Sequence, residues 1–392
     1  MKILIVHNAY QHSGGEDTVV HAELGLLRAA GHEVEFYSRC NTELRDMLPF
    51  KAAGAAFWNA SAAQQIERLC TAFAPDLIHV HNTFPLISPA FFESAVRRRI
   101  PLVQTLHNFR LLCPQGMLLR EGSICRDCIG KAPWRAITRR CYRDSVSQSA
   151  VAAGVLAFHR QRGTYARQIT RYIALNEFCR ATFIEGGLPA ERLSIKPHFV
   201  HAPARTDDVP RAGGLFIGRL SAEKGLDVLC DALALLPGCA VQIIGDGPLA
   251  QLAKDCFGAC YLGTQTPTAV MALLQRAAWL VAPSICYETF GMSLIEAFAC
   301  GTPVIASAHG AYAELVRDGV TGLLFRPGDP ADLARKIAWA EAHPAQMRRM
   351  GESARRDYAL HYTPQRNYEL LMDIYAHAIQ SRQDQCRTLP VC

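Results

Sequence analysis

The sequence contains none of the segments that would carry it into or across a membrane. No run approaches the roughly 18 consecutive apolar residues of a transmembrane helix, and the longest mild candidate, residues 150–158, falls well short of that length. The apolar stretch within residues 1–7 is too short for a signal peptide. We therefore expect a cytoplasmic protein that is at most peripheral on the inner face of a membrane.

The sequence also lacks a large excess of one charge sign and two common phosphate-binding motifs. The formal net charge is only +6, which is too small to indicate nucleic acid but allows contact with anionic substrates or an anionic membrane surface. Neither Gly-x-Gly-x-x-Gly nor Gly-x-x-x-x-Gly-Lys-[Ser/Thr] occurs, so hydride transfer and P-loop hydrolysis lose support. With 50% hydrophobic and 19% charged residues in 392, the composition is globular and the length suits two or three domains.

Strands and helices alternate along the first half of the chain. Residues 3–6 are a short apolar run, typical of a strand buried on both faces of a parallel sheet. Such alternation predicts a doubly wound α/β domain. The other elements expected in this half are strands at 33–37, 77–80, 102–106 and 172–175, and helices at 17–30, 62–73 and 89–98.

A second α/β half follows a break rich in Asp, Pro and Gly at residues 203–214. Residues 330–380 continue it with a helical pattern that Pro344 and Pro364 interrupt. Two doubly wound sheets are expected to face a central cleft, because ligands bind at the carboxyl ends of parallel strands. The strands predicted here are 215–220, 241–244, 279–283, 303–306 and 322–325.

The most specific stretch is residues 287–305, in which Glu288 and Glu296 frame Phe290-Gly291-Met292. Gly291 would let backbone amides face a ligand, and a helix N-terminus favours a diphosphate. Glu296, about two turns into the helix, could accept hydrogen bonds from two vicinal ribose hydroxyls, and Glu288 in the preceding loop could reach a donor sugar. The alternative is an amphipathic helix with two solvated glutamates.

This stretch resembles the signature of family-4 glycosyltransferases, which have the GT-B fold, and the resemblance is strongest over residues 215–326. It implies an N-terminal acceptor-side domain over 1–205 with a Cys-rich insertion at 108–142. A nucleotide-sugar domain over 206–363 and a helix over 364–392 that crosses back to the first domain would follow. The donor-binding residues that it implies are Gly14, Gly15, Asn176, Gly218, Arg219, Lys224, Gly245, Gly247, Glu288, Phe290, Gly291, Met292 and Glu296.

The resemblance also implies four catalytic residues, Glu288, His107, Arg219 and Lys224. Two cations would stabilise a departing nucleoside diphosphate as its negative charge grows. The alternative for Lys224 is a pairing with Glu223. No Asp-x-Asp motif occurs, which fits catalysis without a metal and with no cofactor.

Several polar residues follow predicted strands in the first half. Members of the family have a histidine at the position of His107 that contacts the donor sugar. His79 and His81 share one face of their strand because side chains alternate, and we interpret them as structural or acceptor-side residues. After Gly14-Gly15, Glu16 and Asp17 either contact the acceptor or, in the case of Asp17, cap a helix.

Four of the fifteen cysteines, Cys113, Cys125, Cys128 and Cys141, lie in one long insertion. Cys125 and Cys128 form a Cys-x-x-Cys pair, and the outer cysteines lie about a dozen residues away, a spacing that can close a structural zinc site. One reversible disulfide or plain thiols are the alternatives.

A basic segment over residues 131–171 holds nine arginines and lysines and a single acid, Asp144, with aromatic residues interspersed. It is either a solvated helix face or a surface for an anionic membrane or a lipid-diphosphate acceptor.

Together these observations predict a retaining glycosyltransferase. It would move a sugar from a nucleoside diphosphate sugar to a hydroxyl acceptor, lipid-linked or glycan, in surface polysaccharide biosynthesis. The alternatives are a GT-B sugar-nucleotide epimerase, which would need no acceptor, and a non-catalytic scaffold that uses the cysteine cluster.

Overall fold

The computed structural model describes residues 1–11, 14–204 and 210–388, with side chains up to residue 384, and resolves two compact units. Unit 1 comprises Met1–Met117, Arg126–Lys196 and the C-terminal segment from Tyr368. Unit 2 comprises Leu118–Cys125 and Pro197–Asn367. Residues 205–209 of the expected break at 203–214 lie outside the described residues.

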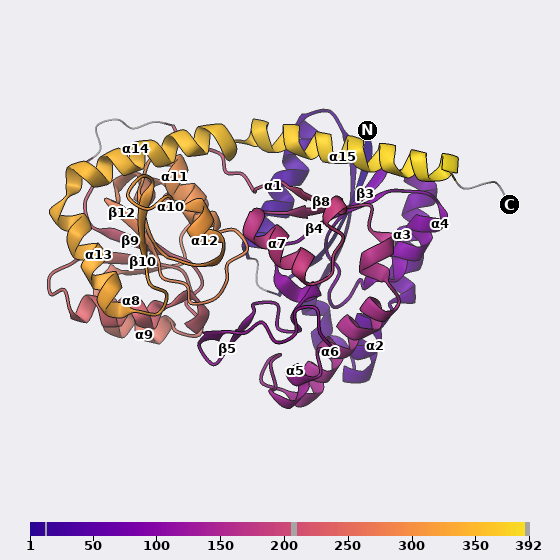
Figure 1. The fold of residues 1–392 in the computed structure, drawn as a ribbon, viewed down its shortest axis with the longest axis horizontal. Coiled ribbons are helices and arrows are strands. Elements are labelled where there is room, and N and C mark those ends of the chain that lie inside the picture. The colour runs from indigo at the N-terminus through magenta and orange to yellow at the C-terminus, as the bar shows by residue number, and fades with distance from the viewer. Residues whose placement is uncertain (12–13, 205–209, 389–392) are drawn as a thin grey trace. The chain divides into compact units, whose positions relative to one another are not determined.

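Unit 1 is built on a parallel six-stranded sheet in the order β2-β1-β3-β4-β7-β8 (Figure 1). Its strands are β1 (Lys2–Ala9), β2 (Glu33–Cys40), β3 (Leu77–Asn82), β4 (Leu102–Thr105), β7 (Arg171–Ala174) and β8 (Leu193–Ile195). Its helices are α1 (Gly15–Ala29), α2 (Pro49–Phe57), α3 (Ala60–Phe73), α4 (Phe92–Arg97), α5 (Arg135–Thr138), α6 (Val146–Gln161), α7 (Glu177–Glu185) and most of α15 (Pro364–Thr388).

Both faces of this sheet are covered, as its unbroken apolar strands predict. Ile3 and Ile5 of β1 pack against α1 and against Leu371 and Tyr375 of α15. Leu4 points to the opposite face and is also fully buried. Helix α15 begins in unit 2, and its residues from Tyr368 belong to unit 1.

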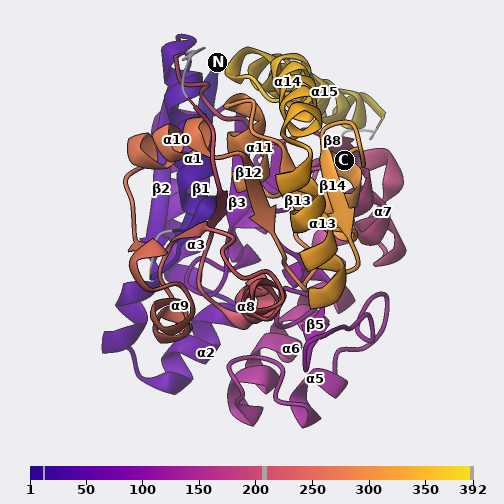
Figure 2. The same ribbon diagram turned by 90° about the vertical axis from the view of Figure 1, so that its left-hand side faces the viewer.

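Unit 2 carries a second parallel sheet, in the order β11-β10-β9-β12-β13-β14. Its strands are β9 (Gly214–Ile217), β10 (Val241–Ile244), β11 (Tyr261–Gly263), β12 (Trp279–Ala282), β13 (Val304–Ser307) and β14 (Gly322–Phe325). Its helices are α8 (Leu226–Ala234), α9 (Ala250–Phe257), α10 (Pro267–Arg276), α11 (Met292–Ala299), α12 (Gly310–Leu315), α13 (Pro330–Ala342) and α14 (Pro344–His361), and α8 packs beside α13 (Figure 2). A short hairpin of β5 (Leu119–Arg120) and β6 (Ser123–Ile124) also belongs to this unit.

The prediction of two doubly wound Rossmann-like domains is confirmed. The structure differs from the prediction at the ends of some elements and at the edge strands of the two sheets. The strand expected at 215–220 ends at Ile217, and a 3₁₀ turn (Pro89–Phe91) begins the helix expected at 89–98. The edge strands β8 and β11 are missing from the sequence analysis, because three residues without a buried run produce no periodic signal.

The carboxyl ends of β9 and β10 approach each other unusually closely. The amide of Gly218 donates to the carbonyl of Ile244 at 3.1 Å, and the amide of Leu220 donates to the carbonyl of Asp246 at 2.9 Å. Gly245 has φ +140°, and a Cβ there would lie 1.8 Å from the Gly218 carbonyl oxygen. Only glycine permits this approach.

We expect Gly245→Ala to lower the unfolding free energy of unit 2 by about 3 kcal/mol or more, because it combines backbone strain with a clash. Urea denaturation measures this loss. The control is Gly258→Ala, where φ is +52° but no atom lies within 4 Å of the added Cβ, and about 1 kcal/mol is expected. Equal losses in the two variants would contradict the role of close approach.

Candidate active site

The topology of unit 2 determines where its functional side chains gather. Strand β9 is the first strand of the sheet and lies between β10 and β12, so the strand order reverses between β9 and β12. Loops diverge at such a switch point, and ligands of α/β proteins bind there. The loop after β9 carries Arg219 and Lys224, and the loop after β12 carries Glu288.

Lys224 and Glu288 form an ion pair at this switch point. The ammonium of Lys224 lies 2.6 Å from Glu288 Oε1, and the hydroxyl of Ser284 donates to the same oxygen at 2.8 Å. Gly225 makes the pair possible, because its φ of +72° brings its Cα so near Pro283 that a Cβ would lie 2.0 Å from the Pro283 carbonyl oxygen. The alternative pairing of Lys224 with Glu223 is not the contact observed, since Glu223 accepts from Ser221 at 2.6 Å.

The pair keeps both side chains charged although both are partly buried. Burial alone would raise the pKa of Glu288, but the Lys224 charge and the hydrogen bonds from Lys224 and Ser284 outweigh it and lower the pKa. Burial opposes the charge on Lys224, and the Glu288 carboxylate raises its pKa well above the ordinary value. The result is a fixed carboxylate and a fixed ammonium beside the β9 and β12 loops.

Arg219 is exposed in the loop directly after β9, beside the Gly245–Gly247 turn. Gly218 and Gly247 also belong to this closely packed pair of loops, since a Cβ at Gly247 would meet the Leu220 carbonyl at 2.4 Å. The structure therefore brings Gly218, Arg219, Gly245 and Gly247 together, all four of which are among the donor-binding residues that the resemblance implies.

Helix α11 begins at Met292 after Gly291, and Glu296 follows on this helix. Burial raises the pKa of Glu296, whose side chain is half-buried. Phe290 is buried and packs edge-to-face on His198, with ring centroids 5.1 Å apart. Phe290 thus packs in the interior of unit 2, and His198, which the sequence analysis missed, is its neighbour.

In unit 1, Gly14 precedes α1 and Gly15 begins it. The carboxylate of Asp17 accepts from the amide of Gly14 at 3.0 Å and lies 2.7 Å from His7 Nε2. Asp17 is therefore the helix cap that the sequence analysis gave as the alternative to acceptor contact.

Glu16 lies beside this cap, in a cluster with Tyr10 and Asn108. Its Oε2 accepts from the Tyr10 hydroxyl at 2.9 Å and from the Asn108 amide at 3.4 Å. Burial raises the pKa of Glu16 to about 7, and the neighbouring His7 partly offsets this rise.

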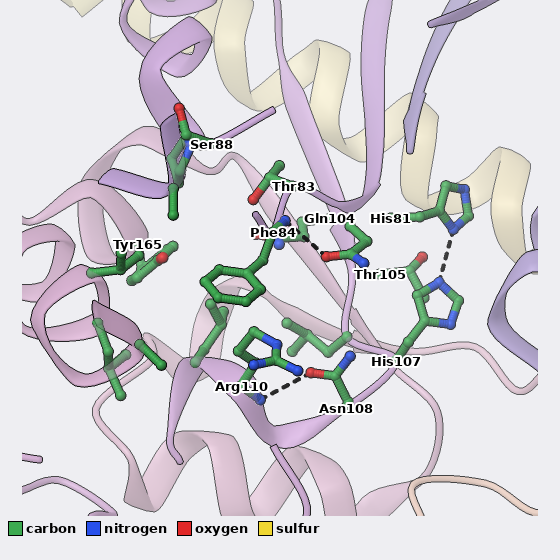
Figure 3. Close-up of a pocket in the computed structure, with 18 residues that line it drawn as sticks. His81, Thr83, Phe84, Ser88, Gln104, Thr105, His107, Asn108, Arg110 and Tyr165 are labelled. Atoms are coloured by element: carbon green, nitrogen blue, oxygen red, sulfur yellow. Dashed lines mark hydrogen bonds between the residues drawn. The ribbon is translucent and has the colours of Figure 1, made fainter. Parts of the chain in front are cut away.

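His107 lies just beyond β4 and borders a pocket within unit 1 (Figure 3). Its Nε2 lies 2.9 Å from His81 Nδ1. Apolar side chains of α2 and α6 line one part of the pocket, and polar side chains line the rest. Among these is Gln104, whose buried Oε1 has no hydrogen-bond partner within the part of the chain that the structure describes. In the same wall, the guanidinium carbon of Arg110 lies 4.6 Å from the centroid of the Phe84 ring.

Behind this pocket lies a buried charged cluster that the sequence analysis missed in part. Glu23 of α1 pairs with Lys196, which follows β8, at 2.8 Å. His79 and His81 of β3 are adjacent, with ring centroids 4.2 Å apart, so the prediction that they share a face is confirmed. The only signal for Glu23 was a charged residue among the apolar positions of α1.

Among the described residues, Glu23, His79 and His81 are the single group of three potential metal ligands whose ligating atoms lie within 4.8 Å of one another. Lys196 already balances the charge of Glu23. Of the four insertion cysteines, Cys125 belongs to unit 2 and the other three belong to unit 1. Those three, Cys113, Cys128 and Cys141, do not form such a group of ligands in the described structure. The structural zinc site stays a prediction.

Two other expected sites have structural partners. The side-chain oxygen of Asn176 caps α7 by accepting from the amide of Cys179 at 2.8 Å. In the basic segment, Arg160 points inward and donates to the carbonyls of Lys131 and Leu111 at 2.7 and 2.9 Å. Within the described part of the chain, no helix is both long enough and apolar enough to span a bilayer.

Two Rossmann-like α/β units in one chain are the architecture of the GT-B class. Residues 14–198 match the family described as Glycosyl transferase 4-like domain, and residues 213–357 match Glycosyl transferases group 1. The chain belongs to the family-4-like glycosyltransferases of GT-B fold.

Individual relatives agree with this assignment. A D-inositol 3-phosphate glycosyltransferase of Mycolicibacterium vanbaalenii is 36% identical over 331 residues, 78% of this chain and 67% of that protein. A glycogen synthase of Mycobacterium tuberculosis is 27% identical over 91% of this chain and 89% of its own. The solved structure of Anabaena Alr3699/HepE in complex with UDP-glucose has a TM-score of 0.67 at 19% identity, covers 96% of this chain and 100% of its own, and shows the shared fold.

The raised pKa of Glu16 predicts a pH-dependent stability. Between pH 4.5, where the unfolded carboxyl ionises, and about 7, the folded state binds the additional proton, so the unfolding free energy falls as pH rises. Glu16→Gln should lack this slope and gain up to about 3 kcal/mol over wild type by pH 8. Urea denaturation at several pH values tests this. The exposed Glu33→Gln serves as the control, and parallel curves for Glu16→Gln and wild type would contradict the prediction.

Proposed function

We propose that this glycosyltransferase moves a sugar from a nucleoside diphosphate sugar to a hydroxyl group of a lipid-linked or glycan acceptor, with retention of anomeric configuration. The observation that carries the donor side is the Lys224–Glu288 pair at the switch point of unit 2, beside the exposed Arg219. Related solved structures contain UDP and UDP-glucose, so uridine diphosphate sugars are the first donors to test. Surface polysaccharide assembly is the setting proposed for this reaction.

On the donor side, the cations would act on the leaving group. An ammonium has three N–H donors, of which Glu288 takes one, so Lys224 is held in place to contact a diphosphate. Arg219 would add a second positive charge, and the two together would stabilise the departing diphosphate without a catalytic metal or cofactor. The departing phosphate would accept the proton of the attacking hydroxyl, which is the front-face route to retention.

Glu288 and Glu296 would bind the sugar and the ribose. The carboxylate of Glu288 is ionised and accepts hydrogen bonds, so it would orient hydroxyls of the donor sugar. Glu296 on α11 would accept from ribose hydroxyls.

On the acceptor side, the pocket of unit 1 supports a ligand that is part apolar and part hydroxylated. Its apolar wall comes from Val155 and Leu156 of α6, and its polar wall includes Gln104. His107, which we propose contacts the donor sugar, lies at the border of this pocket. A buried amide oxygen without a partner costs free energy unless a ligand donates to it. A hydroxyl of the acceptor would satisfy Gln104 Oε1.

The first test is thermal stabilisation by UDP, GDP, ADP and dTDP, each with and without an attached sugar. A ligand at about 100 times its Kd adds about 2.7 kcal/mol, a shift of a few degrees. Stabilisation by one diphosphate would name the donor, and NMR of the product's anomeric proton would test retention. No shift with any of the four would overturn the donor site.

Glu288→Gln should lower kcat by about 100-fold while the nucleotide Kd changes little, because the lost charge acts on the sugar. Arg219→Ala should instead raise the Kd for the nucleoside diphosphate by about 10-fold. Steady-state kinetics and calorimetry separate the two effects. The exposed Glu352→Gln and Arg349→Ala of α14 are the matched controls. Unchanged kcat in Glu288→Gln, or unchanged affinity in Arg219→Ala, would remove that residue from its role.

We also propose that unit 1 docks on an anionic membrane surface through α2, α5 and α6, which pack together at one end of the unit (Figures 1 and 2). Phe50 and Trp134 are exposed there, at 68% and 58%. Exposed aromatic residues near arginines suit a headgroup region. Some of these charges are internally paired, since Asp127 binds Arg135 and Arg139.

Wild type should sediment with vesicles that contain about 30% anionic lipid and be released by salt, because the attraction is largely electrostatic. The double variant Phe50→Ser/Trp134→Ser should sediment at least several-fold less. Leu360→Ser, which removes an exposed leucine of unit 2, is the control and should sediment as wild type. Absence of salt-sensitive sedimentation of the wild type would overturn membrane docking.

A further inference from the structure

A line of three side chains, Glu23 and His81 buried and His107 half-buried, runs from helix α1 to the pocket of unit 1. Glu23 Oε1 lies 3.6 Å from His81 Nε2, and His81 Nδ1 lies 2.9 Å from His107 Nε2. Figure 3 shows the His81–His107 contact at the edge of the pocket. Three elements thus contribute one residue each: α1, β3 and the loop after β4.

Glu23 is ionised in this cluster. Burial opposes its charge, but Lys196 at 2.8 Å and the imidazole of His79 at 3.0 Å outweigh burial and lower its pKa well below the ordinary range. Glu23 is 1% exposed, so the carboxylate acts on its neighbours without screening by water.

His81 is neutral and carries a single ring proton. Burial and the nearby His79 lower its pKa well below the ordinary value, and Glu23 only partly offsets them. A neutral imidazole has one N–H donor and one acceptor nitrogen, and the tautomer follows from the surroundings.

The surroundings place that proton on Nε2 of His81. His81 Nε2 is buried, has no hydrogen-bond partner among the described residues, and faces Glu23 Oε1 at 3.6 Å. The same carboxylate oxygen also lies 3.0 Å from His79 Nδ1. A proton on Nε2 is attracted to the carboxylate, whereas a lone pair there would face the lone pairs of the oxygen and be repelled. His81 Nδ1 is therefore an acceptor, and His107 Nε2 must be the donor in the 2.9 Å contact.

We propose that Glu23 and His81 are positioning residues that hold His107 as its Nε2-protonated tautomer, which turns His107 Nδ1 into a hydrogen-bond acceptor for a sugar hydroxyl. The consequence for the reaction rests on the proposed function, in which His107 contacts substrate. In the other tautomer, or in an imidazolium, Nδ1 would carry a proton. It could then not accept a hydrogen bond from a sugar hydroxyl. The arrangement parallels carboxylate-oriented histidines elsewhere, with one imidazole inserted between the two partners.

The tautomer can be measured directly. In the full-length protein with ¹⁵N-labelled histidine, long-range ¹H–¹⁵N correlation spectra distinguish the two neutral tautomers and the imidazolium. His107→Gln assigns the resonances of His107. We expect a protonated Nε2 and an unprotonated Nδ1 at pH 7.5. A protonated Nδ1 or a charged ring at that pH would overturn the proposal, and this measurement needs no variant of the cluster to fold.

A paired substitution tests the role of Glu23. Glu23→Gln/Lys196→Met removes both charges together, so that no buried ion is left without a partner. We expect the Nδ1-protonated form of His107 to rise to a detectable fraction and kcat to fall by about 10-fold or more, with the nucleotide Kd unchanged. An unaltered His107 tautomer in this variant would overturn the assignment of Glu23.

The matched control is His159→Gln, which removes a different buried imidazole of unit 1. His159 contacts the Phe57 carbonyl at 3.0 Å and Thr164 at 3.1 Å, outside the Glu23 line. It should lower the melting temperature but leave the His107 tautomer as in wild type. A protein that shows the expected tautomer but transfers no sugar would refute the proposed function and leave the structural inference standing.

Discussion

The structure depends on one electrostatic constraint, which a lysine–glutamate pair in each unit satisfies. A carboxylate removed from water is costly unless a cation and hydrogen-bond donors surround it. In unit 1 Glu23 meets Lys196 at 2.8 Å, and in unit 2 Glu288 meets Lys224 at 2.6 Å. Each pair joins segments that are distant in the sequence, and the side chains expected to carry function lie next to it.

The two ion pairs can act on different partners because they are buried to different degrees. Glu23 and Lys196 are almost fully buried, so their charges act only through neighbouring protein groups such as His79 and His81. Lys224 keeps 30% of its side-chain surface exposed, so its charge can reach a ligand. The degree of burial thus distinguishes the pair that we propose orients other side chains from the pair that we propose binds substrate.

Close backbone packing is the second constraint on the site of unit 2. Gly225 lies against Pro283 and Gly245 lies against Gly218, at distances that no side chain would allow. These contacts bring the loops after β9, β10 and β12 together at the point where the strand order reverses. The ion pair of Lys224 with Glu288 is a consequence of this packing.

Much of the fold was predictable because it rests on local patterns. Runs such as residues 3–6 are apolar on both faces, and only a sheet covered on both sides accommodates them. Pro344 and Pro364 mark the first residues of α14 and α15, as expected of a residue without an amide proton. The three-residue strands β8 and β11 escaped because their sequences hold too few residues to show a period.

The candidate site, like the fold, was predictable only where it depends on local patterns. Glu288, Arg219 and Lys224 were proposed from the resemblance to the family's motifs, and the shared face of His79 and His81 followed from strand alternation. The sequence by itself therefore determined the two α/β halves, the glycine turns and the identity of the polar residues at the strand ends. Only the tertiary structure decided which charges meet. Glu23 and Lys196 are 173 residues apart, and long-range sheet order, which no local pattern encodes, places them in contact.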